Sequence, residues 1–467
     1  MFLIFSTIIL LKFLGICISA DVQLGNQQLR DSSWETLDGH RVAILTNPSG
    51  IFADTLEHIV DVMAAEDSAH AYDLVAIFGP EHGFRGEKQA ETSDPAVPYI
   101  DQATGLPVYS AYALSVEDMA DIFVANNISA VVVDMQDVGV RLYTFVWTMY
   151  NVMNATAFAT DPRGNTSRAP MKFVICDRPN PLGGELVDGP VVNMECCSSG
   201  YGLAPIPHVH GMTIGELGSL FHINYLPGLY ELEVMRVTGW RRRDSWMDMV
   251  NQGCTLPWVP PSPNIPTPTS VLAFASTVFL EATSVAEGRG TTTPFELIGA
   301  PFVSDTQALA TRLNSFCAVA GGNGRACARA AYFQPTFSKY NGTVVPGIQW
   351  LTSQQHDATS CAASSVSVSS LDEDRSDEQK LLYRTPFLVA TEILRSFMVL
   401  AEPREAFVWD GSWFGHPGTE LIDDYAGTPE YREMLNDFQI SPKQIYSHFQ
   451  PQAEQFRRFR EPFLMYT

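Results

Sequence analysis

The feature that most constrains the fold is a pattern repeated between residues 41 and 177, in which an apolar run is followed by a polar cluster and then by a segment with helical periodicity. The four apolar runs are 41–45, 74–78, 130–133 and 172–176, and each is continuous, as strands covered on both faces are. Segments 58–63 and 143–150 are predicted to be helices, and a further helix is expected to begin at Thr213, where Thr213 and Glu216 have capping-box spacing. This alternation predicts an α/β fold with a doubly wound parallel sheet.

The chain is long enough for more than one lobe, since its 467 residues are 46% apolar and single domains most often have roughly 100–150 residues. We expect one domain over 21–300 and a second, smaller C-terminal α/β domain over 301–467, which ends in a helix at 443–460. The proline-rich segment 258–270 is predicted to be extended. Segment 355–378, serine-rich and then acidic, is predicted to be an exposed loop of low complexity.

Residues 1–20 form an apolar run that ends in small side chains, which is typical of a secretory signal peptide cleaved near Ala20. Lys12 lies inside the run, so an uncleaved membrane anchor is the alternative. No later segment has the roughly twenty apolar residues of a transmembrane helix, so we expect no stable membrane insertion after cleavage. The predicted location is outside the cell or in the lumen of the secretory or endolysosomal pathway. Sequons at Asn127, Asn154, Asn165 and Asn341 are then candidate glycosylation sites.

Acidic residues outnumber basic ones by 52 to 29, which gives a net charge of −23. Without the leader and its Lys12 the balance is 52 to 28, or −24. Such a chain repels a phosphate backbone, so no nucleic-acid partner is expected.

Eight cysteines become seven without Cys17, so at least one is unpaired or bonds another chain. The neighbours Cys196 and Cys197 are not expected to bond each other. Their candidate partners are Cys254, Cys317, Cys327 and Cys361.

Polar clusters follow all four predicted strands, at the carboxyl ends where open α/β sheets bind ligands. The clusters are 46–50 (TNPSG), 81–86 (EHGFRG), 134–141 (DMQDVGVR) and 177–181 (DRPNP). Helix caps and turns are the alternative explanation, because Asp, Asn, Ser and Gly favour such positions. Capping requires neither the Glu81-His82 pair nor three arginines, so a binding edge accounts for the clusters better.

Two further segments, 208–213 (HVHGMT) and 286–296 (AEGRGTTTPFE), add histidines, acids and glycines that let a ligand approach the backbone. Dinucleotide and P-loop sites are excluded, since neither glycine motif is present, and the lack of G-x-S-x-G weakens a serine hydrolase. His208 and His210, with Asp134, Asp137 or His82, are candidate zinc ligands, but no second pair with zinc-site spacing is visible. The acids among arginines and histidines suit a sugar substrate, because paired carboxylates usually cleave glycosidic bonds.

Seven blocks stand in order along the chain: FGPEHGFRGE, TGLPVYS, DMQDVGVRLYTF, DRPNPLGG with VDGP, HGMTIGEL, WVPPSPNIPT and EGRGTTTPFELIGAP. Together they resemble the signature blocks of the exo-β-N-acetylmuramidases, glycoside hydrolase family 171, from about Gly25 to at least Pro301 and more thinly to the C-terminus. The resemblance implies a Rossmann-like lobe, a smaller C-terminal lobe and no cofactor. It also implies release of N-acetylmuramic acid from the non-reducing end of peptidoglycan fragments. The 355–378 insertion, sequons and extra cysteines depart from the bacterial members.

The resemblance implies that Glu81 is the general acid, because the whole block around it agrees. Asp137 and Glu287 are candidates for the second carboxylate, as nucleophile or as water-activating base. Four arginines suit the lactyl carboxylate of muramic acid: Arg85, Arg141, Arg178 and Arg289. The other predicted sugar contacts are His82, Tyr143, Asp177, Asn180, His210 and Asn264.

A peptidoglycan-derived sugar is the partner that these predictions imply, and no metal is assigned. The alternative from a different class is a non-catalytic protein that binds wall fragments or sugars in the same cleft. A metal-dependent hydrolase is the third interpretation.

Overall fold

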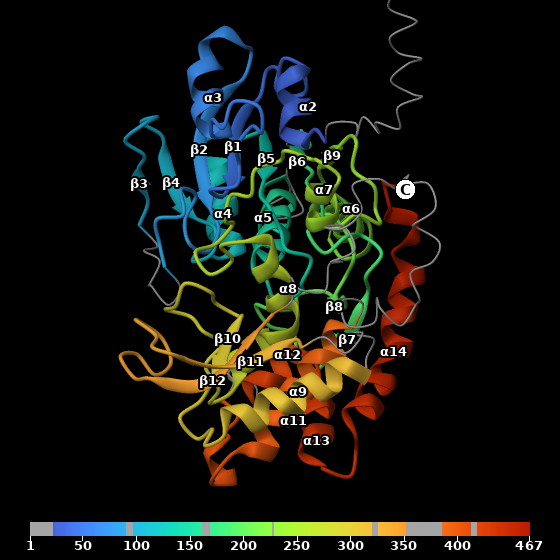
Figure 1. The fold of residues 1–467 in the computed structure, drawn as a ribbon. Helices are drawn as coiled ribbons and strands as arrows, with labels where there is room; N and C mark the ends of the chain where they lie inside the picture. Colours follow the sequence, from blue (N-terminus) through green and yellow to red (C-terminus); the bar gives the residue numbers. More distant parts are fainter. Residues whose placement is uncertain are drawn as a thin grey trace, which may run out of the picture.

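The structure is a computed structural model that describes residues 22–89, 97–160, 169–226, 228–319, 326–351, 385–411 and 418–467. The predicted signal peptide and the 355–378 loop lie outside these residues. Figure 1 shows two lobes, one that holds the large sheet and one, in yellow to red, that holds a small sheet and most of the C-terminal helices.

A seven-stranded sheet forms the first lobe, in the order β3-β4-β2-β1-β5-β6-β9, and every neighbouring pair is parallel except β3 and β4. The predicted α/β class and four predicted strands are confirmed. From β1 the chain passes to β2 on one side, whereas β5 lies on the other side, so the ends of β1 and β5 border a topological switch point. The strands are β1 (Arg41–Thr46), β2 (Asp73–Gly79), β3 (Tyr99–Ile100), β4 (Pro107–Ser110), β5 (Ala130–Asp134), β6 (Lys172–Cys176) and β9 (Glu231–Met235).

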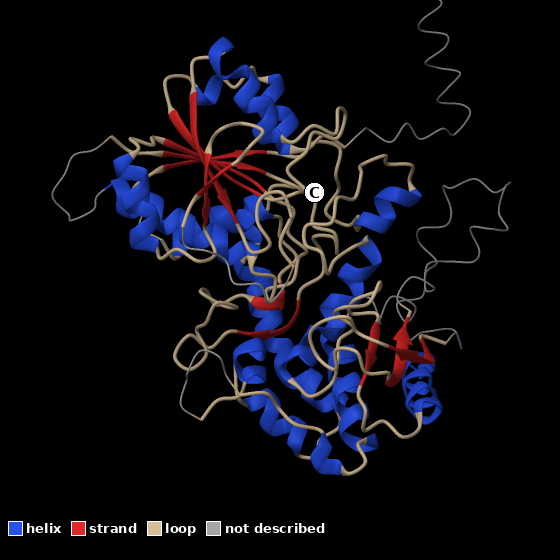
Figure 2. Ribbon diagram, turned by 90° about the vertical axis from the view of Figure 1, so that its left-hand side faces the viewer, coloured by secondary structure: helices blue, strands red, loops and turns tan. Residues whose placement is uncertain are grey.

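Helices cover both faces of this sheet (Figure 2). Helices α2 (Gly25–Asp31) and α3 (Ile59–Glu66) pack on one face, in a core cluster that includes Ile44. The other face packs against α4 (Val116–Ala125), α5 (Phe145–Thr160) and α6 (Ile214–Asn224), and Leu45 belongs to that second cluster. Because successive strand residues point to opposite faces, covering both faces requires the continuous apolar runs of the sequence.

Two local predictions have different outcomes. The capping box of α6 is confirmed: Thr213 N–H donates to Glu216 Oε2 (3.1 Å), and Glu216 N–H donates to Thr213 Oγ1 (3.2 Å). The prediction that 258–270 is extended throughout is wrong at its end, since α8 (Pro268–Thr277) begins there. Proline is compatible with the first turn of a helix, because the N–H that it lacks has no helical partner at that position.

The second lobe packs helices against an antiparallel sheet of β10 (Leu297–Gly299), β12 (Val345–Trp350) and β11 (Ala328–Phe333), in that order. A small ribbon, β7 (Asp188–Val191) with β8 (Pro207–Val209), lies against α14 between the lobes. The remaining helices are α7 (Trp246–Asn251), α9 (Thr306–Val319), α11 (Pro386–Leu400), α12 (Leu421–Ala426), α13 (Glu430–Asn436) and α14 (Pro442–Phe459). The largest core cluster has members in both lobes, Phe387 and Val133 among them, so the lobes share one apolar core.

Two disulfides join cysteines of the described chain, Cys317 to Cys327 and Cys196 to Cys197. The prediction that the adjacent pair would not bond is wrong. A turn over residues 194–196, closed by the hydrogen bond from Cys197 N–H to the Asn193 carbonyl (3.0 Å), brings the two sulfurs together.

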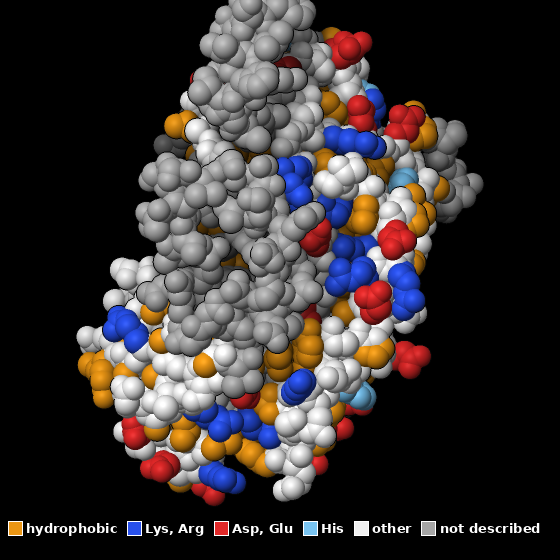
Figure 3. All heavy atoms as spheres, turned by 45° about the vertical axis from the view of Figure 1, so that its right-hand side comes forward, with side chains coloured by type: hydrophobic (Ala, Val, Ile, Leu, Met, Phe, Trp, Pro, Cys, Tyr) orange, Lys and Arg blue, Asp and Glu red, His pale blue; other side chains and the backbone are white. Residues whose placement is uncertain are grey.

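The surface carries both signs of charge: on the face in Figure 3, Lys and Arg side chains lie among Asp and Glu side chains. Within the described ranges, no helix has the length and apolar character needed to cross a membrane.

Candidate active site

The three acidic residues predicted to act in catalysis come from different parts of the fold. Glu81 follows β2, Asp137 follows β5, and Glu287 precedes β10. The first two share a neighbour, Tyr143, whose pKa is raised well above its ordinary value, first by burial and then by the charges of Asp137 and Glu81. Arg289, from the second lobe, acts on Tyr143 in the opposite direction. Thr144, in the segment after β5, donates to Glu81 at 2.6 Å, so the ends of β2 and β5 adjoin.

Glu81 is half-buried and held through one carboxyl oxygen. Thr144 Oγ1 donates to Glu81 Oε2 at 2.6 Å. The loop after Glu81 turns sharply, with left-handed φ angles of 74° at His82 and 80° at Gly83. Gly79 pairs with Ser110 across β2 and β4, and Tyr112 follows β4. Burial raises the pKa of Tyr112 to about 12, and the charge of Glu81 contributes.

His82 and His210 are both buried, in different settings. Burial lowers the pKa of His82, an effect that Arg289 increases and Glu81 opposes. His210 Nδ1 accepts from Met212 N–H (3.2 Å), which leaves the proton of a neutral ring on Nε2. That Nε2 lies 3.5 Å from Asp137 Oδ2.

Asp137 is 6% exposed and is incompletely hydrogen-bonded. Its Oδ2 accepts from Gly139 N–H at 2.8 Å and faces His210. Its Oδ1 is buried with no hydrogen-bond partner among the described residues. A buried carboxylate oxygen without a donor is costly, and such atoms are frequent where a ligand or water belongs.

Glu287 lies between two cations of the second lobe. Its Oε1 is 3.4 Å from Arg289 Nε, and its Oε2 is 3.3 Å from Lys339 Nζ. Arg289 also donates to Glu281 through Nε (3.0 Å) and Nη2, and Tyr425 OH donates to the other oxygen of Glu281 (2.8 Å). Although burial acts to lower the pKa of Arg289, Glu281 and Glu287 raise it above its ordinary value.

The other three predicted arginines are engaged by the protein itself. Arg85 forms ion pairs with Asp61 (2.7 Å) and Asp101 (2.9 Å). Arg141 is fully buried and donates to the carbonyls of Tyr201 (2.8 Å) and Tyr425 (2.6 Å). Burial lowers its pKa to about 9. Arg178 Nε donates to Asp134 Oδ1 at 2.6 Å, on the side of the sheet that faces α2.

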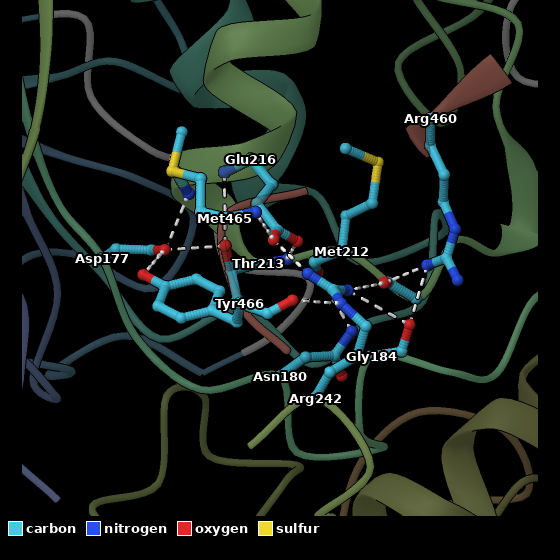
Figure 4. Close-up of polar contacts among 12 residues, drawn as sticks. Asp177, Asn180, Gly184, Met212, Thr213, Glu216, Arg242, Arg460, Met465 and Tyr466 are labelled. Atoms are coloured by element: carbon cyan, nitrogen blue, oxygen red, sulfur yellow. Dashed lines mark hydrogen bonds and ion pairs between the residues drawn. The ribbon is translucent and has the colours of Figure 1, made fainter. Parts of the chain in front are cut away.

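Asp177, Asn180 and Asn264 also have partners within the protein. Asp177 belongs to a network at the end of β6, where Thr213 Oγ1 (2.7 Å) and Gly215 N–H (2.8 Å) donate to its carboxylate (Figure 4). Asn180 Nδ2 donates to the Met212 carbonyl at 3.0 Å. Asn264 Nδ2 donates to Gln89 Oε1 at 3.0 Å.

Family profiles of the exo-β-N-acetylmuramidase NamZ match nearly the whole chain, the N-terminal domain over residues 42–269 and the C-terminal domain over residues 272–466. The chain belongs to this family. A curated relative, the peptidoglycan β-N-acetylmuramidase NamZ of Bacillus subtilis (strain 168), is 40% identical over 328 residues, which cover 70% of this chain and 72% of the relative.

Two solved structures of this fold are similar along almost all of the chain. Both are DUF1343 family proteins of Bacteroides fragilis NCTC 9343, 25% identical, and each comparison covers 96% of this chain and 99% of the other. The TM-scores are 0.72 and 0.66. This chain therefore shares its fold, a doubly wound sheet with a second, smaller lobe, with both DUF1343 proteins.

Several residues around the site of this family member were not predicted from its sequence. Thr144 and Tyr112 hold or flank Glu81, whereas Glu281 and Lys339 fix the charges around Glu287. Thr144 lies in the block DMQDVGVRLYTF, which also holds Asp137. The sequence could therefore have indicated Thr144 as a residue of the site. Lys339 comes from a distant segment, and no spacing in the sequence relates it to Glu287.

The described residues contain no group of three or more His, Cys, Asp or Glu side chains arranged to hold a metal ion. His208, one of the candidate zinc ligands, is fully buried, and its Nε2 lies 2.7 Å from the Ala275 carbonyl. Burial lowers the pKa of His208 to about 3.

Proposed function

We propose that this chain is a glycoside hydrolase that releases terminal N-acetylmuramic acid from the non-reducing end of peptidoglycan fragments. The observation that carries the proposal is the hydrogen bond (2.6 Å) from Thr144 Oγ1, in the segment after β5 that also holds Asp137, to Glu81 Oε2 after β2, in a member of the NamZ family. Cleavage of a glycosidic bond usually requires two carboxyl groups, one on each side of the bond.

Glu81 is the general acid in this proposal. Thr144 holds Oε2, so Oε1 is the oxygen that carries the proton toward the bridging oxygen. Transfer of that proton breaks the bond between the anomeric carbon and the bridging oxygen and releases the remaining fragment as an alcohol. The sugar then carries oxocarbenium character, which an anionic carboxylate stabilises.

Asp137 is the better of the two candidates for the second carboxylate. Both oxygens of Glu287 face cations, Arg289 and Lys339, so Glu287 holds those cations in place. Asp137 instead has one oxygen without a donor and one that His210 orients. Asp137 is therefore free to attack the anomeric carbon or to take a proton from the water that does so.

Arg289 is the arginine that suits the lactyl carboxylate. Its guanidinium lies over the Phe295 ring (5.3 Å), and Phe274 contacts both Phe295 and Tyr143. Glu281 occupies its Nε and Nη2, which orients the group and leaves Nη1 for a ligand. His82, Tyr143 and His210 are the remaining predicted sugar contacts in this region.

A chromogenic β-N-acetylmuraminide tests the proposal with wild type, Glu81→Gln and the matched surface variant Glu405→Gln. We expect turnover by wild type and Glu405→Gln, and a loss of about 10²–10⁴-fold in Glu81→Gln. Binding without turnover in wild type would instead support a sugar-binding protein. Loss of wild-type activity on chelation would support a metal-dependent hydrolase.

We also propose that the chain is exported and glycosylated. The apolar segment 1–20 supports export, and two disulfides suit an oxidising compartment. The sequon asparagines Asn127 and Asn341 are exposed, so glycans there meet no packed side chains. Sequencing of the secreted protein should find a new N-terminus after Ala20, and enzymatic deglycosylation should lower its mass. An intact Met1 in membrane pellets would contradict this proposal.

A further inference from the structure

The guanidinium of Arg289 lies at the end of a chain of polar contacts that begins in the first lobe. Its partner Glu281 belongs to the 3₁₀ helix η3 (Val278–Ala282), and Glu281 Oε1 accepts from Arg289 Nε (3.0 Å) and Nη2. The other oxygen of Glu281, Oε2, accepts from Tyr425 OH at 2.8 Å. Both oxygens of this carboxylate are therefore occupied, and Nη1 is the nitrogen of Arg289 that remains for an anion.

Tyr425 connects Glu281 to the rest of the protein. It lies in α12 and is buried, and burial raises the pKa of its hydroxyl well above the ordinary value, so the hydroxyl keeps its proton at neutral pH. Its ring contacts the ring of Tyr201 edge to face, with centroids 4.7 Å apart. A hydrogen bond from a neutral hydroxyl to a carboxylate is stronger than one between neutral groups. The hydroxyl of Tyr425 therefore fixes the orientation of the Glu281 carboxylate.

Arg141 holds Tyr425 from the first lobe. It follows β5, is fully buried, and donates to the backbone carbonyls of Tyr201 (2.8 Å) and Tyr425 (2.6 Å). These hydrogen bonds go to carbonyl groups and not to a carboxylate, and a buried cation that lacks an acidic partner is costly for the fold. In return, Arg141 ties α12 of the second lobe to the segment after β5.

The orientation of Arg289 depends on Glu281, because a second carboxylate competes for the guanidinium. Glu287 Oε1 lies 3.4 Å from Arg289 Nε. The backbone at Glu281 is fixed separately, since Lys339 Nζ donates to the carbonyls of Leu280 (2.9 Å) and Glu281 (3.0 Å). Loss of the hold on the Glu281 carboxylate therefore leaves the backbone in place but lets the guanidinium turn toward Glu287. An arginine binds a carboxylate well only when its N–H groups point at the oxygens.

We propose that Tyr425 is a positioning residue for recognition of a sugar carboxylate. Through Glu281 it sets the guanidinium of Arg289, and Arg141 acts one step further back by holding Tyr425. Neither Tyr425 nor Arg141 touches the sugar, so the predicted contact between Arg141 and the lactyl carboxylate is replaced by an indirect role. The inference rests on the proposed function, in which Arg289 binds the lactyl carboxylate.

Titration of the full chain by calorimetry tests the proposal with two probes, N-acetylmuramic acid and N-acetylglucosamine, which lacks the lactyl group. Tyr425→Phe removes the hydroxyl and keeps the ring. The matched control is Tyr431→Phe, at a second buried tyrosine, whose hydroxyl pairs with Thr391 Oγ1 (3.1 Å). We expect Tyr425→Phe to bind N-acetylmuramic acid about 3–10-fold more weakly and N-acetylglucosamine as the wild type does. Tyr431→Phe should change neither affinity.

A double-mutant cycle shows whether Tyr425 acts through Glu281. In the Glu281→Ala background the hydroxyl has lost its acceptor, so adding Tyr425→Phe should change the Kd of N-acetylmuramic acid by less than about twofold. An undiminished loss in that background would overturn the proposal. Wild-type affinity for N-acetylmuramic acid in Tyr425→Phe alone would also overturn it, as would equal weakening of both sugars.

Muraminide kinetics separate positioning from a general loss of structure. Arg289 grips a group that does not react, so Tyr425→Phe should raise KM by the same factor and leave kcat unchanged. A lower kcat at unchanged KM would contradict the positioning role. Failure of the wild type to hydrolyse the muraminide would sink the proposed function but leave the binding result intact. Equal affinity of the wild type for both sugars would instead overturn this inference and leave hydrolysis to the assay.

Discussion

Two groups of buried carboxylates lie at strand ends in this protein, and they differ in how completely they are paired. At the end of β6, all four oxygens of Asp177 and Glu216 accept hydrogen bonds, from donors that include Thr213, Arg242 and Tyr466 (Figure 4). Near Glu81, by contrast, the buried Asp137 Oδ1 has no hydrogen-bond partner within the described chain.

The difference separates a structural site from the proposed catalytic site. The complete network ties the C-terminal segment to the first lobe, since Met465 N–H donates to Glu216 and Tyr466 OH donates to Asp177. A buried network of this kind stabilises the fold when every member is satisfied. The incomplete group leaves Asp137 Oδ1 without a donor, and a substrate or water can satisfy that oxygen.

The largest expected effect is on activity, in Asp137→Asn. Loss of an anionic carboxylate beside the anomeric carbon should lower kcat/KM by about 10²–10⁴-fold, or roughly 3–5 kcal/mol of transition-state stabilisation. Stability should change by less than about 1 kcal/mol, because Oδ1 has no partner to lose. Muraminide kinetics and urea unfolding measure the two. A variant that keeps its activity but unfolds at a lower urea concentration would contradict this expectation.

Glu216→Ala should show the opposite behaviour. It leaves Arg242 buried without its counter-charge and Met465 N–H without an acceptor. We expect the free energy of unfolding to fall by about 3–5 kcal/mol, as when one partner of a buried ion pair is removed. Glu454→Ala, at an exposed ion pair, is the control and should cost less than about 1 kcal/mol. Equal urea midpoints for the two variants would contradict the structural assignment.

The raised pKa of a buried carboxyl group at the end of β6 predicts how stability depends on pH. Burial raises the pKa of Asp177 to about 6, despite hydrogen bonds from Tyr466 and Thr213 that act to lower it. The folded state then binds the proton more tightly than the unfolded state, whose carboxyl has its ordinary value of 3.8. Stability therefore decreases as pH rises from about 4 to about 6 and is constant above that, by at most about 3 kcal/mol for this group.

Urea unfolding across this pH range measures the effect, and Asp177→Asn should remove its share of the slope. Asp188, whose pKa burial also raises to about 6, contributes a second share that remains in that variant. A slope that is identical with and without Asp177 would contradict the expectation.

The smallest effect is expected for Tyr466→Phe. The variant loses the hydroxyl that donates to Asp177 and accepts from Val237 N–H (3.1 Å). The cost should be about 1–2 kcal/mol, with kcat/KM unchanged. Thermal unfolding and the muraminide assay check both, and a larger loss of activity than of stability would place this tyrosine in the catalytic region instead.

The sheet was predictable from the sequence because both faces are covered, which makes the runs at 41–45 and 130–133 continuously apolar. The cap of α6 was predictable because its signal spans only Thr213 to Glu216. The bond between Cys196 and Cys197 was not, since it depends on a local turn.

The site was only partly predictable, because a sequence shows which residues stand at strand ends but not which of them already have partners. Asp137 and Asp177 look alike in the sequence, yet the partners of Asp177 come from α6 and from the C-terminus. The acceptors of Arg141 likewise lie far along the chain, at Tyr201 and Tyr425. Such long-range pairing follows from packing between lobes, which no local pattern encodes.

The central claim, that Glu81 protonates the leaving oxygen, is tested most directly by varying the leaving group. Glu81→Gln and wild type are compared on an alkyl muraminide, whose leaving oxygen needs a proton, and on a dinitrophenyl muraminide, whose leaving oxygen does not. We expect a loss of about 10³-fold on the alkyl substrate and less than about tenfold on the dinitrophenyl substrate. Equal losses on both would show that Glu81 does not act as the acid.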